Sequence, residues 1–512
     1  MKAQVYSELE NVVGAENISN DSAITEAYSR NPWPAGILLR RRPDAVLLPG
    51  CREEVQSIVR MANRYKFAII SGGNYNYDVP TRPDTIVLDF KRMNKIEIDV
   101  KNMFALVEPG VTHAQLSAEC MKSGLLCNST FAGGPAGVVA NNLFFGVGGF
   151  NYRLGFNRVI SSLEWILPTG ELLKIGSMGT TEGGYFWPEG PGPDFRGLVR
   201  GFVGVLGGFG VCTRMGVKLY PWPGPALYPC SGISPTYQVA FPPDKFRFHL
   251  IRYPDFKDVI NGMYEIGRAE IGVVMQRIAA GTFLYKSTES KEQYWNEAAT
   301  NYFQKEAKNI IALWLWGYSS SRQLQYEEKV LQSIIAETGG EDIPEDHKIY
   351  RSVVESWLGD HFRCGFTGRH MRVAGTHAIV MLGSDSLDHA YKVSNVMADL
   401  RRQFTHTFPY GEQSDWVIAH DFAWQAEVDI YVTPEITVEH MQASAGLAVD
   451  GVKESLAEKL YDVAQVAQTN PLLGPVYGNY HELLKKIKKT LDPNNIANPP
   501  NPIAIEEDPE KG

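Results

Sequence analysis

The segment "SGGNYNYDVP" (residues 71–80) contains residue types that could hold a phosphate group. It follows the short apolar run "KFAII" and therefore stands at the end of an expected buried strand. Glycine adopts left-handed backbone conformations at no steric cost and asparagine tolerates them, so successive N–H groups could point into one anion-binding concavity. The hydroxyl of Ser71 would add a donor. Taken alone, however, the segment favours an ordinary surface turn.

Two further glycine-rich segments favour a ligand-binding turn over an ordinary surface turn. "AGGPAGVVANN" (132–142) is too apolar for a flexible linker, and we expect neither an ordinary helix nor an ordinary strand there. "GGFGV" (207–211) is the third glycine turn. Small residues allow a backbone to approach a large flat ligand, although close packing of two backbones explains "AGGPAGVVANN" equally well. Together, the three turns favour one extended ligand that touches all of them.

The common nucleotide-binding and metal-binding motifs are absent from the sequence. Neither G-x-G-x-x-G nor G-x-x-x-x-G-K-[ST] occurs, which excludes a Rossmann dehydrogenase and a P-loop enzyme. His481-Glu482 is followed by Leu-Leu-Lys-Lys, so H-E-x-x-H is absent too. The six cysteines form no C-x-x-C pair, which argues against a self-contained iron–sulfur cluster or zinc knuckle and indicates a reduced cytoplasm.

Length and charge narrow the class of protein. A chain of 512 residues is long enough for two or three domains. Its net charge of −9 argues against nucleic acid or an anionic membrane surface as the main partner. No run approaches a membrane span, and "MKAQVYSELENVVG" lacks the apolar core of a signal peptide. We therefore expect a cytoplasmic protein.

The elements that position the glycine turns have a mixed α+β pattern over residues 1–220. "CREEVQSIVRMANRYK" (51–66) has apolar residues at helical spacing, with acidic residues in its first turn. Three strand-like runs follow, "TIVLDF", "KIEIDV" and "FALVEPGV", and their short polar links predict hairpins. A helix at 112–125, a strand–turn–strand at 159–176 and a helix, glycine turn and strand at 195–223 complete this part.

The pattern of predicted helices and strands changes after the Pro-rich boundary "YPWPGPALYPCSG". A strand followed by an amphipathic helix then occurs four times, which predicts an antiparallel sheet with helices on one face. The aromatic segments "WLWGY" and "WVIAHDFAW" either line an apolar pocket or pack in the core. Finally, "YHELLKKIKKTLDPNNIANPPNP" (480–502) predicts a helix ended by Asp-Pro, in which "KKIKK" forms a solvated face.

The order of these segments over residues 40–222 resembles the FAD-binding domain of the vanillyl-alcohol oxidase/p-cresol methylhydroxylase superfamily. The carboxyl-terminal helix and tail also resemble those of glycolate-oxidase-type flavin 2-hydroxyacid dehydrogenases. The resemblance implies an α+β protein with a bipartite FAD-binding domain (1–222 and 471–512) and a substrate-binding cap domain (223–470). We call residues 223–470 the cap.

The resemblance also implies which residues contact FAD. The pyrophosphate loop, the "EPGV" turn, the central glycine-rich segment, the start of the last strand and the tail each match the family's pattern. The residues are Ser71, Gly72, Gly73, Asn74, Tyr75 and Asn76; Pro109, Gly110 and Val111; Gly134, Pro135, Gly137, Val138, Asn141 and Asn142; Gly208, Gly210 and Val211; and Asn498.

Departures from the family pattern affect the expected chemistry. Members with covalent flavin carry a histidine in the loop or the cap, but Asn74 stands in this loop, and the cap position falls on 425–427. The resemblance therefore implies non-covalent FAD. The acidic residue beside the flavin aligns near Ala132, which argues against an ordinary phenol oxidase. Tyr77, by contrast, matches a tyrosine that helps to bind the phenol.

Several side chains are candidates for proton transfer or substrate orientation. Histidine can act as a general base near neutral pH. "AHDFAWQAEVDIYV" resembles the metal-binding stretch of flavin 2-hydroxyacid dehydrogenases, so His420 and Glu427 are also candidate ligands of a divalent metal. A cap strand with a hydrogen-bonded histidine and an ion-paired glutamate is the alternative. The candidate catalytic residues are Tyr77, Tyr152, His370, His406, His420 and Glu427.

The resemblance implies an FAD-dependent oxidoreductase. The expected reaction removes a hydride from an alcohol or hydroxylated carbon of a small, aromatic or carboxylated substrate. A non-redox flavoenzyme like alkyl-dihydroxyacetone-phosphate synthase is the alternative among enzymes. An electron-transfer subunit, whose partner carries iron–sulfur clusters or a haem, is the alternative of another class. Whether the chain forms a homo-oligomer stays open.

Overall fold

The structure is a computed structural model, and the part of the chain that it describes is discontinuous. The described residues are 1–29, 41–72, 80–127, 134–144, 160–176, 178, 195–200, 204–227, 229–231, 238–278, 280–354, 376–384, 386–403, 415–420, 423–432, 437–460 and 470–505. Among them, no helix combines the length and the apolar composition needed to cross a bilayer.

The first sheet has four strands in the order β1-β2-β4-β3. β2 (Ala45–Leu47), β4 (Thr85–Asp89) and β3 (Ala68–Gly72) run parallel, and β1 (Ile18–Ser19) is antiparallel to β2. The sequence prediction that β4 forms a hairpin with the next strand is wrong. The helix α3 (Arg52–Tyr65) crosses over between β2 and β3, so these two strands run in the same direction on either side of β4.

Helices cover this sheet with their apolar stripes. α1 (Ala3–Val13) and α3 pack against the buried strands and form one core with them. A short turn of 3-10 helix, η1 (Ala15–Asn17), and α2 (Ser22–Ala27) complete the amino-terminal part. The predicted helix at 51–66 is confirmed; it ends at Lys66, which adopts a left-handed conformation. These helices leave β3, at the sheet edge, available to pair with another segment.

The second sheet is antiparallel and has six strands. β5 (Ile96–Asp99), β6 (Phe104–Val107), β10 (Val211–Pro221), β8 (Ile160–Ile166) and β9 (Leu172–Gly176) lie in that order, and β7 (Leu125–Cys127) also pairs with β10. The predicted strand–turn–strand at 159–176 is confirmed as β8 and β9. α4 (His113–Met121) begins at a capping box, in which Thr112 and Gln115 bond each other's backbone N–H groups.

The central glycine-rich segment contains a helix that we did not expect. α5 (Val138–Phe144) begins directly after Gly137, and Asn142 donates a hydrogen bond of 2.8 Å to the carbonyl of Val138. The prediction that residues 132–142 contain no ordinary helix is therefore wrong for 138–142. In the described part of this segment, Gly134 to Gly137 form an irregular turn, and the Val-Val-Ala-Asn-Asn run that follows makes the helix. The helix α6 (Arg196–Val199) precedes the third glycine turn.

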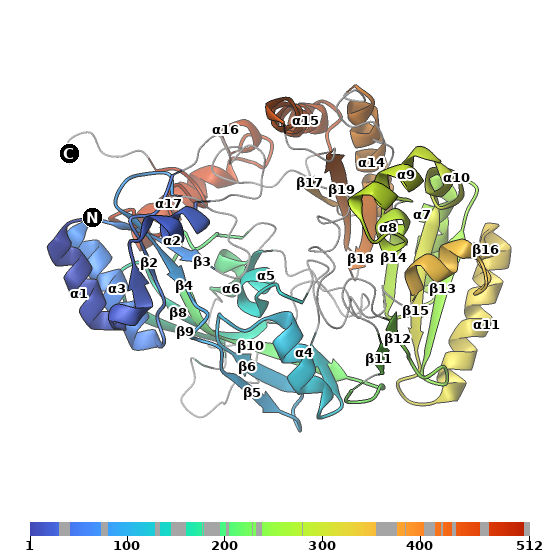
Figure 1. Cartoon of the computed structure of the whole chain (residues 1–512), viewed down its shortest axis with the longest axis horizontal. Coiled ribbons are helices and arrows are strands. Elements are labelled where there is room, and N and C mark those ends of the chain that lie inside the picture. Colours follow the sequence, from blue (N-terminus) through green and yellow to red (C-terminus); the bar gives the residue numbers. More distant parts are fainter. Residues whose placement is uncertain are drawn as a thin grey trace.

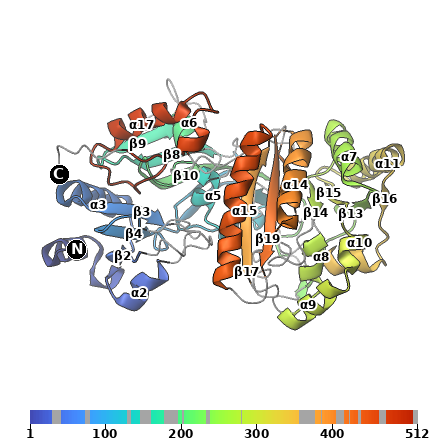
Figure 2. The same ribbon diagram turned by 90° about the horizontal axis from the view of Figure 1, so that it is seen from above.

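The third sheet lies in the cap and has seven strands, all antiparallel. Their order is β16-β13-β15-β14-β18-β19-β17, with bounds Glu341–Asp342, Phe246–Arg252, Ile310–Trp316, Val274–Ile278, Asp415–His420, Ala423–Val432 and Thr376–Ser384. Four helices, α7 (Phe256–Arg268), α11 (Ser321–Thr338), α14 (Leu387–Arg402) and α15 (Val438–Ala457), share one core with it. The four predicted strand–helix units are thus confirmed (Figures 1 and 2).

A second core lies on the other face of the cap sheet and reaches the first half of the chain. α8 (Ala280–Lys286), α9 (Lys291–Ala299) and α10 (Tyr302–Glu306) contribute to it, together with Met121, Leu126 and Trp222. The ring of Trp222 meets that of Trp316 edge to face, with 5.3 Å between centroids. Trp314 and Trp316 are both buried, so "WLWGY" packs in the core. A short hairpin of β11 (Cys230–Ser231) and β12 (Gln238–Val239) lies between the halves.

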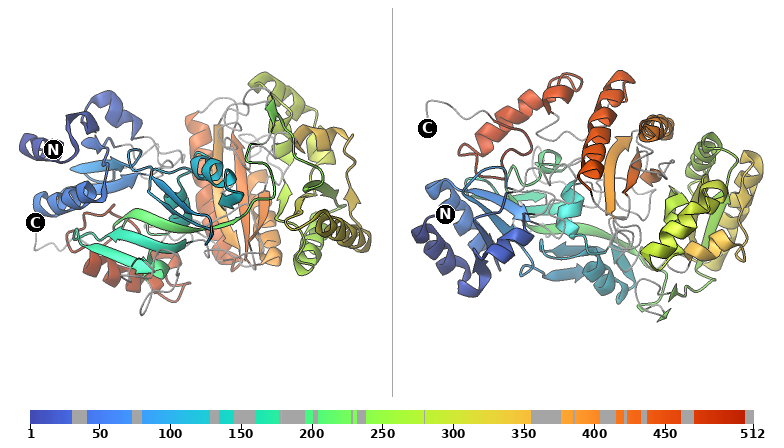
Figure 3. Two further views of the ribbon diagram at one scale, coloured as in Figure 1. Left: turned by 90° about the horizontal axis from the view of Figure 1, so that it is seen from below. Right: turned by 45° about the horizontal axis from the view of Figure 1, so that its top comes forward.

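The carboxyl-terminal segment returns to the first half of the molecule. After α16 (Asn470–Leu473), the helix α17 (Tyr480–Leu491) packs on the core of the six-stranded sheet through Leu484, Ile487 and Leu491. Figures 1 and 3 show this red helix beside the blue and green amino-terminal elements. The predicted helix and its end at Asp492 are confirmed. The chain is therefore placed to bring its tail to the glycine turns.

Candidate cofactor site

The end of β3 and the turn 204–210, which we call the glycine turn, lie in direct contact. Gly207 has φ of +76°, and a β-carbon added there would stand 2.3 Å from the hydroxyl oxygen of Ser71. Only glycine fits both the backbone conformation and the space. Gly210, with φ of +123°, approaches the carbonyl of Ile166 equally closely. The glycine turn is thus held between the two sheets of the first half.

A small pocket, which we call the cleft, lies between these elements. The described residues that line it include no carboxylate. Ser71 adds a hydroxyl, and the glycines expose backbone to the cleft. The lining residues are Val59, Ile69, Ser71, Leu167, Pro168, Gly207, Gly210, Val211, Ile496 and Ala497.

The "EPGV" turn and the central glycine-rich segment form one unit. Thr112 and Gly137 make an isolated antiparallel bridge, and the amide of Val138 donates to the carbonyl of Val111 over 2.9 Å. The amide of Ala114 donates to the carbonyl of Gly134 over the same distance. Gly110 is explained by packing, because a β-carbon there would stand 2.3 Å from the carbonyl oxygen of Phe90. The two segments predicted to bind one ligand therefore lie side by side.

This unit also touches the glycine turn. Gly204, with φ of +58°, lies so close to α5 that an added β-carbon would stand 2.3 Å from the carbonyl oxygen of Leu143. The unit contains several of the predicted cofactor residues. They are Pro109, Val111, Gly134, Gly137 and Val138. Contacts thus run without interruption from Ser71 through the glycine turn to α5 and the "EPGV" turn.

The carboxyl-terminal tail closes the other side of the cleft. Ile69 of β3 and Ala497 form a parallel bridge, and the amide of Asn498 donates to the carbonyl of Ile69 over 2.8 Å. The side-chain amide of Asn498 donates to the carbonyl of Leu206 over 2.5 Å. Asn498 adopts φ of +39°, a left-handed conformation that asparagine tolerates. Asn498 thus contacts both β3 and the glycine turn, and its contact with FAD stays a prediction.

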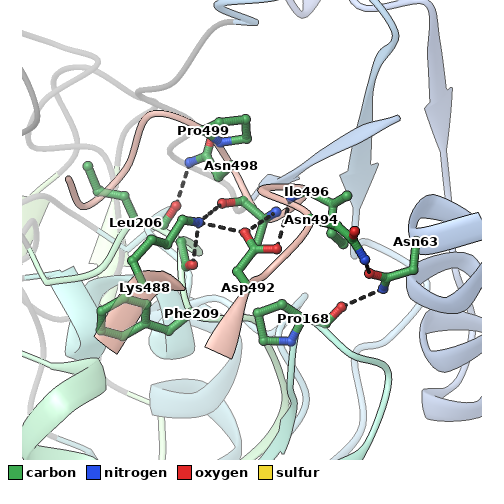
Figure 4. A network of polar contacts seen from close by, with 12 residues as sticks. Asn63, Pro168, Leu206, Phe209, Lys488, Asp492, Asn494, Ile496, Asn498 and Pro499 are labelled. Atoms are coloured by element: carbon green, nitrogen blue, oxygen red, sulfur yellow. Dashed lines mark hydrogen bonds and ion pairs between the residues drawn. The ribbon is translucent and has the colours of Figure 1, made fainter. Parts of the chain in front are cut away.

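A buried ion pair holds the tail, and we did not predict it. Lys488 and Asp492 both have fully buried side chains, and their charged atoms are 2.7 Å apart. The ammonium also donates to the carbonyls of Gly208 and Ala497, each over 2.7 Å (Figure 4). The interpretation of "KKIKK" as a solvated face is therefore wrong for Lys488. A signal existed: Lys488 lies on the apolar stripe of Leu484, Ile487 and Leu491, at helical spacing.

His113 is a buried titratable group beside the central segment. Burial lowers the pKa of the His113 imidazole to about 4, and the neighbouring side chain of Asn141 offsets this in part. Asn141 stands near the ring, although neither ring nitrogen makes a hydrogen bond of good geometry within the described residues. The neutral ring sits at the first residue of α4, where the positive end of the helix dipole also disfavours a cation.

Many of the predicted site residues lie outside the described residues. They are Gly73, Asn74, Tyr75, Asn76, Tyr77, Tyr152, His370 and His406. Gly72 is described and ends β3 opposite Asp89. Pro135 is exposed, and the side-chain amide of Asn142 is bonded within α5.

The backbone register separates the two candidate metal ligands. His420 of β18 pairs with Ala423, whereas Glu427 of β19 pairs with Trp416. The two residues therefore lie four positions apart along the strands, or roughly 13 Å at the rise of a β-strand. This spacing does not favour one metal ion held by both. Within the described part of the chain, no group of three or more potential ligands gathers around one point.

Comparisons with known proteins agree with this geometry. Residues 43–176 match the family described as FAD binding domain. This match decides the cofactor class. The chain contains an FAD-binding domain.

Two sequence relatives match part of the chain. The flavoprotein subunit of 4-cresol dehydrogenase (hydroxylating) from Pseudomonas putida is 32% identical over 223 residues, which cover 41% of each chain. The glycolate oxidase subunit GlcD of Bacillus subtilis is 29% identical over 225 residues, or 43% of this chain and 45% of that one. The matched region thus spans less than half the length of these relatives.

Solved structures share the fold of nearly the whole chain. Substrate-bound p-cresol methylhydroxylase superposes with a TM-score of 0.79 at 18% identity, over 99% of both chains. Alkyldihydroxyacetonephosphate synthase gives a TM-score of 0.64 at 14% identity, over 98% of this chain and 86% of that one. The predicted fold, an FAD-binding domain of this type with an antiparallel α+β cap, is confirmed.

Proposed function

We propose that this protein is an FAD-dependent oxidoreductase that removes a hydride from an alcohol or hydroxylated carbon of a small, aromatic or carboxylated substrate. One observation carries the proposal: β3 and the glycine turn meet the carboxyl-terminal tail at one cleft, whose described lining residues include no carboxylate. The names of the relatives, a cresol dehydrogenase and a glycolate oxidase, support this class of reaction.

The residues of the cleft suit the bound cofactor. Ser71 offers a hydroxyl donor to a phosphate oxygen, and the absence of side chains at Gly207 and Gly210 lets Ser71 and Ile166 approach the glycine turn closely. When bound, the flavin accepts the hydride, and the protein supplies binding and orientation. The cap would place the substrate and assist proton removal. The candidates for that task are Tyr77, Tyr152, His370, His406, His420 and Glu427.

The domain division belongs to this proposal. We assign residues 1–222 and 471–512 to the FAD-binding domain and residues 223–470 to the cap. The packing of α17 on the core of the six-stranded sheet supports the return of the last segment. The position of the seven-stranded sheet, which begins at Phe246, supports the boundary near 223.

Anaerobic mixing with candidate substrates tests the reaction. Purified protein loaded with FAD is mixed with 4-alkylphenols, benzylic alcohols and 2-hydroxyacids, and the flavin absorbance near 450 nm is followed. We expect one class to bleach the flavin and the others to leave it unchanged. Product without net bleaching would instead support a non-redox reaction, as in the alkyl-dihydroxyacetone-phosphate synthase alternative.

A redox partner protein is a second proposal, and one observation favours it. The relative from Pseudomonas putida is named as a flavoprotein subunit, which implies a further subunit in that protein. If this chain also passes electrons to a partner, substrate will bleach the flavin but oxygen will restore its colour slowly. Fast recovery in air would identify an oxidase and remove the need for the partner.

The mode of flavin attachment has its own test. Asn74 stands where covalent members carry histidine, so we propose that FAD is bound without a covalent bond. Acid precipitation of the yellow protein should then leave the flavin in the supernatant. A yellow pellet would show that a different residue attaches the cofactor.

A further inference from the structure

Lys488 links segments that are distant in the sequence, and its three ammonium protons are matched by three acceptors. These are the carbonyl of Gly208, the carbonyl of Ala497 and the carboxylate of Asp492, each at 2.7 Å. An ammonium has three donors, so the group is fully satisfied. Gly208 lies 280 positions earlier in the chain.

Asp492 organises the tail around the same point. One carboxylate oxygen accepts from the amide of Ile496, and the other accepts from the amide of Ala497, each over 2.9 Å. The carboxylate therefore fixes the bend that turns the chain out of α17. Figure 4 shows Lys488 and Asp492 at the centre of this network, between the helix and the tail.

The glycine turn is held by the tail at more than one place. Asn498 bonds the carbonyl of Leu206, and Lys488 bonds that of Gly208. Gly208 also lies so close to the tail that an added β-carbon would stand 2.1 Å from the carbonyl oxygen of Asn501. The neighbouring Gly207 meets Ser71, so the position of the tail sets the position of the wall of the cleft.

Stability alone is a weak explanation for such a pair. Burying two charges costs desolvation energy, and replacing a buried pair by apolar residues is often neutral or stabilising. A charged donor with three fixed acceptors does, however, define one geometry. This favours a positioning role, in which the wall of the cleft is held ready for the ligand.

We propose that Lys488, held by Asp492, is a positioning residue for the cofactor: it clamps the carboxyl-terminal tail onto the glycine turn and so preorganises the cleft for FAD. The inference rests on the proposed FAD-dependent function. It assigns to the tail a part in cofactor affinity, separate from any contact that the tail makes with the flavin itself.

The test compares Lys488→Met with Lys489→Met. Lys489 lies next to Lys488 on the same helix but is exposed, so it controls for the loss of a positive charge. The dissociation constant of FAD is measured by fluorescence titration of the apoprotein. Lys488→Met removes hydrogen bonds from a charged donor, so we expect it to raise the dissociation constant of FAD about 10- to 100-fold. Lys489→Met should leave this dissociation constant unchanged.

Hydrogen exchange in the apoprotein gives a readout that does not depend on flavin. Peptides covering 204–210 and 496–501 should exchange faster in Lys488→Met, whereas those of β13 and β15 in the cap should not change. Glu327→Ala serves as a general destabilisation control. Glu327 is buried in the cap and accepts from the amide of Gly272, so its loss should lower the melting temperature without weakening FAD binding.

A second variant keeps the test valid if Lys488→Met does not fold. Lys488→Met combined with Asp492→Asn leaves no unpaired buried charge, and it should show the same loss of FAD affinity. If a folded variant keeps both its FAD affinity and the slow hydrogen exchange of residues 204–210, the proposed role of Lys488 is wrong. The proposed function would not be affected by that result. If the unsubstituted protein binds no FAD, both the cofactor role of the clamp and the proposed function are overturned.

Discussion

The hydroxyl oxygen of Ser71 lies 2.3 Å from the point where a β-carbon on Gly207 would stand. The two residues are 136 positions apart, since 207 − 71 = 136. Their contact joins the edge of the parallel sheet to the first turn before β10. The Ser71 hydroxyl fits against the glycine turn because residue 207 has no side chain, and both residues line the cleft.

We expect Gly207→Ala to destabilise the protein and weaken FAD binding. An alanine at φ of +76° costs about 1 kcal/mol, and the clash with Ser71 adds about 1–3 kcal/mol. Urea denaturation and FAD titration measure the two effects. Adding Ser71→Ala to Gly207→Ala should restore only the part of the free energy of unfolding that the clash removes.

Gly267→Ala is the matched control for that substitution. Gly267 lies in α7 with no atom within 4 Å of an added β-carbon, and its φ is not positive. Alanine should therefore raise stability by about 0.5–1 kcal/mol through helix propensity. A loss of FAD affinity in Gly267→Ala would contradict our account of Gly207.

His113 should make the protein less stable in mild acid. Its pKa is lowered to about 4 by burial, so between pH 6.5 and pH 4 the unfolded chain binds a proton that the folded chain does not. The free energy of unfolding should thus fall by about 3 kcal/mol from this group as the pH drops from 7 to 4. His113→Leu should flatten this part of the pH curve.

The measurement for His113 is urea unfolding at several pH values. His347→Leu is a suitable control, because His347 lies in the cap and is only partly buried. If the free energy of unfolding falls equally steeply with decreasing pH in His113→Leu and in the unsubstituted protein, groups other than His113 cause the decrease.

Trp222 should couple the unfolding of the two halves. Its ring packs on Trp316 and Phe246 of the cap, at 5.3 and 5.4 Å between centroids. Removing this buried ring in Trp222→Ala should cost about 3–5 kcal/mol. Calorimetry should show a lower melting temperature and separate transitions for the cap and the FAD-binding domain. Tyr326→Ala, at a side chain that is 65% exposed, should change neither.

Chelation should leave the reaction unaffected. His420 and Glu427 lie four positions apart along paired strands, too far to favour one shared ion. Incubation with EDTA followed by desalting should therefore preserve both flavin bleaching and its rate. If EDTA abolishes the activity and a divalent metal restores it, the protein binds a metal through residues other than this pair.

Local sequence patterns predicted most of the elements. The apolar spacing at 51–66 acts within one helix, so its effect can be read without the fold. The pairing of β4 could not be read in this way. Its partners, β2 and β3, come earlier in the chain, and the pairing depends on the crossover of α3.

The candidate site was predicted in part. The glycine-rich turns were recognisable from residue type, because glycine suits left-handed backbone and close approach, whereas Asn498 was selected only through the resemblance of the tail. Lys488 was missed, because a lysine in "KKIKK" is solvated unless another segment covers it. The carbonyls of Gly208 and Ala497 provide that cover, and neither is adjacent to it in the sequence.

The sequence by itself determined where the backbone must bend and which segments resemble an FAD-binding domain, because these depend on residue type and local spacing. Only the tertiary structure decided that β3, the glycine turn and the tail line one cleft. It also decided that a lysine there is buried, since burial depends on what the rest of the chain packs over it.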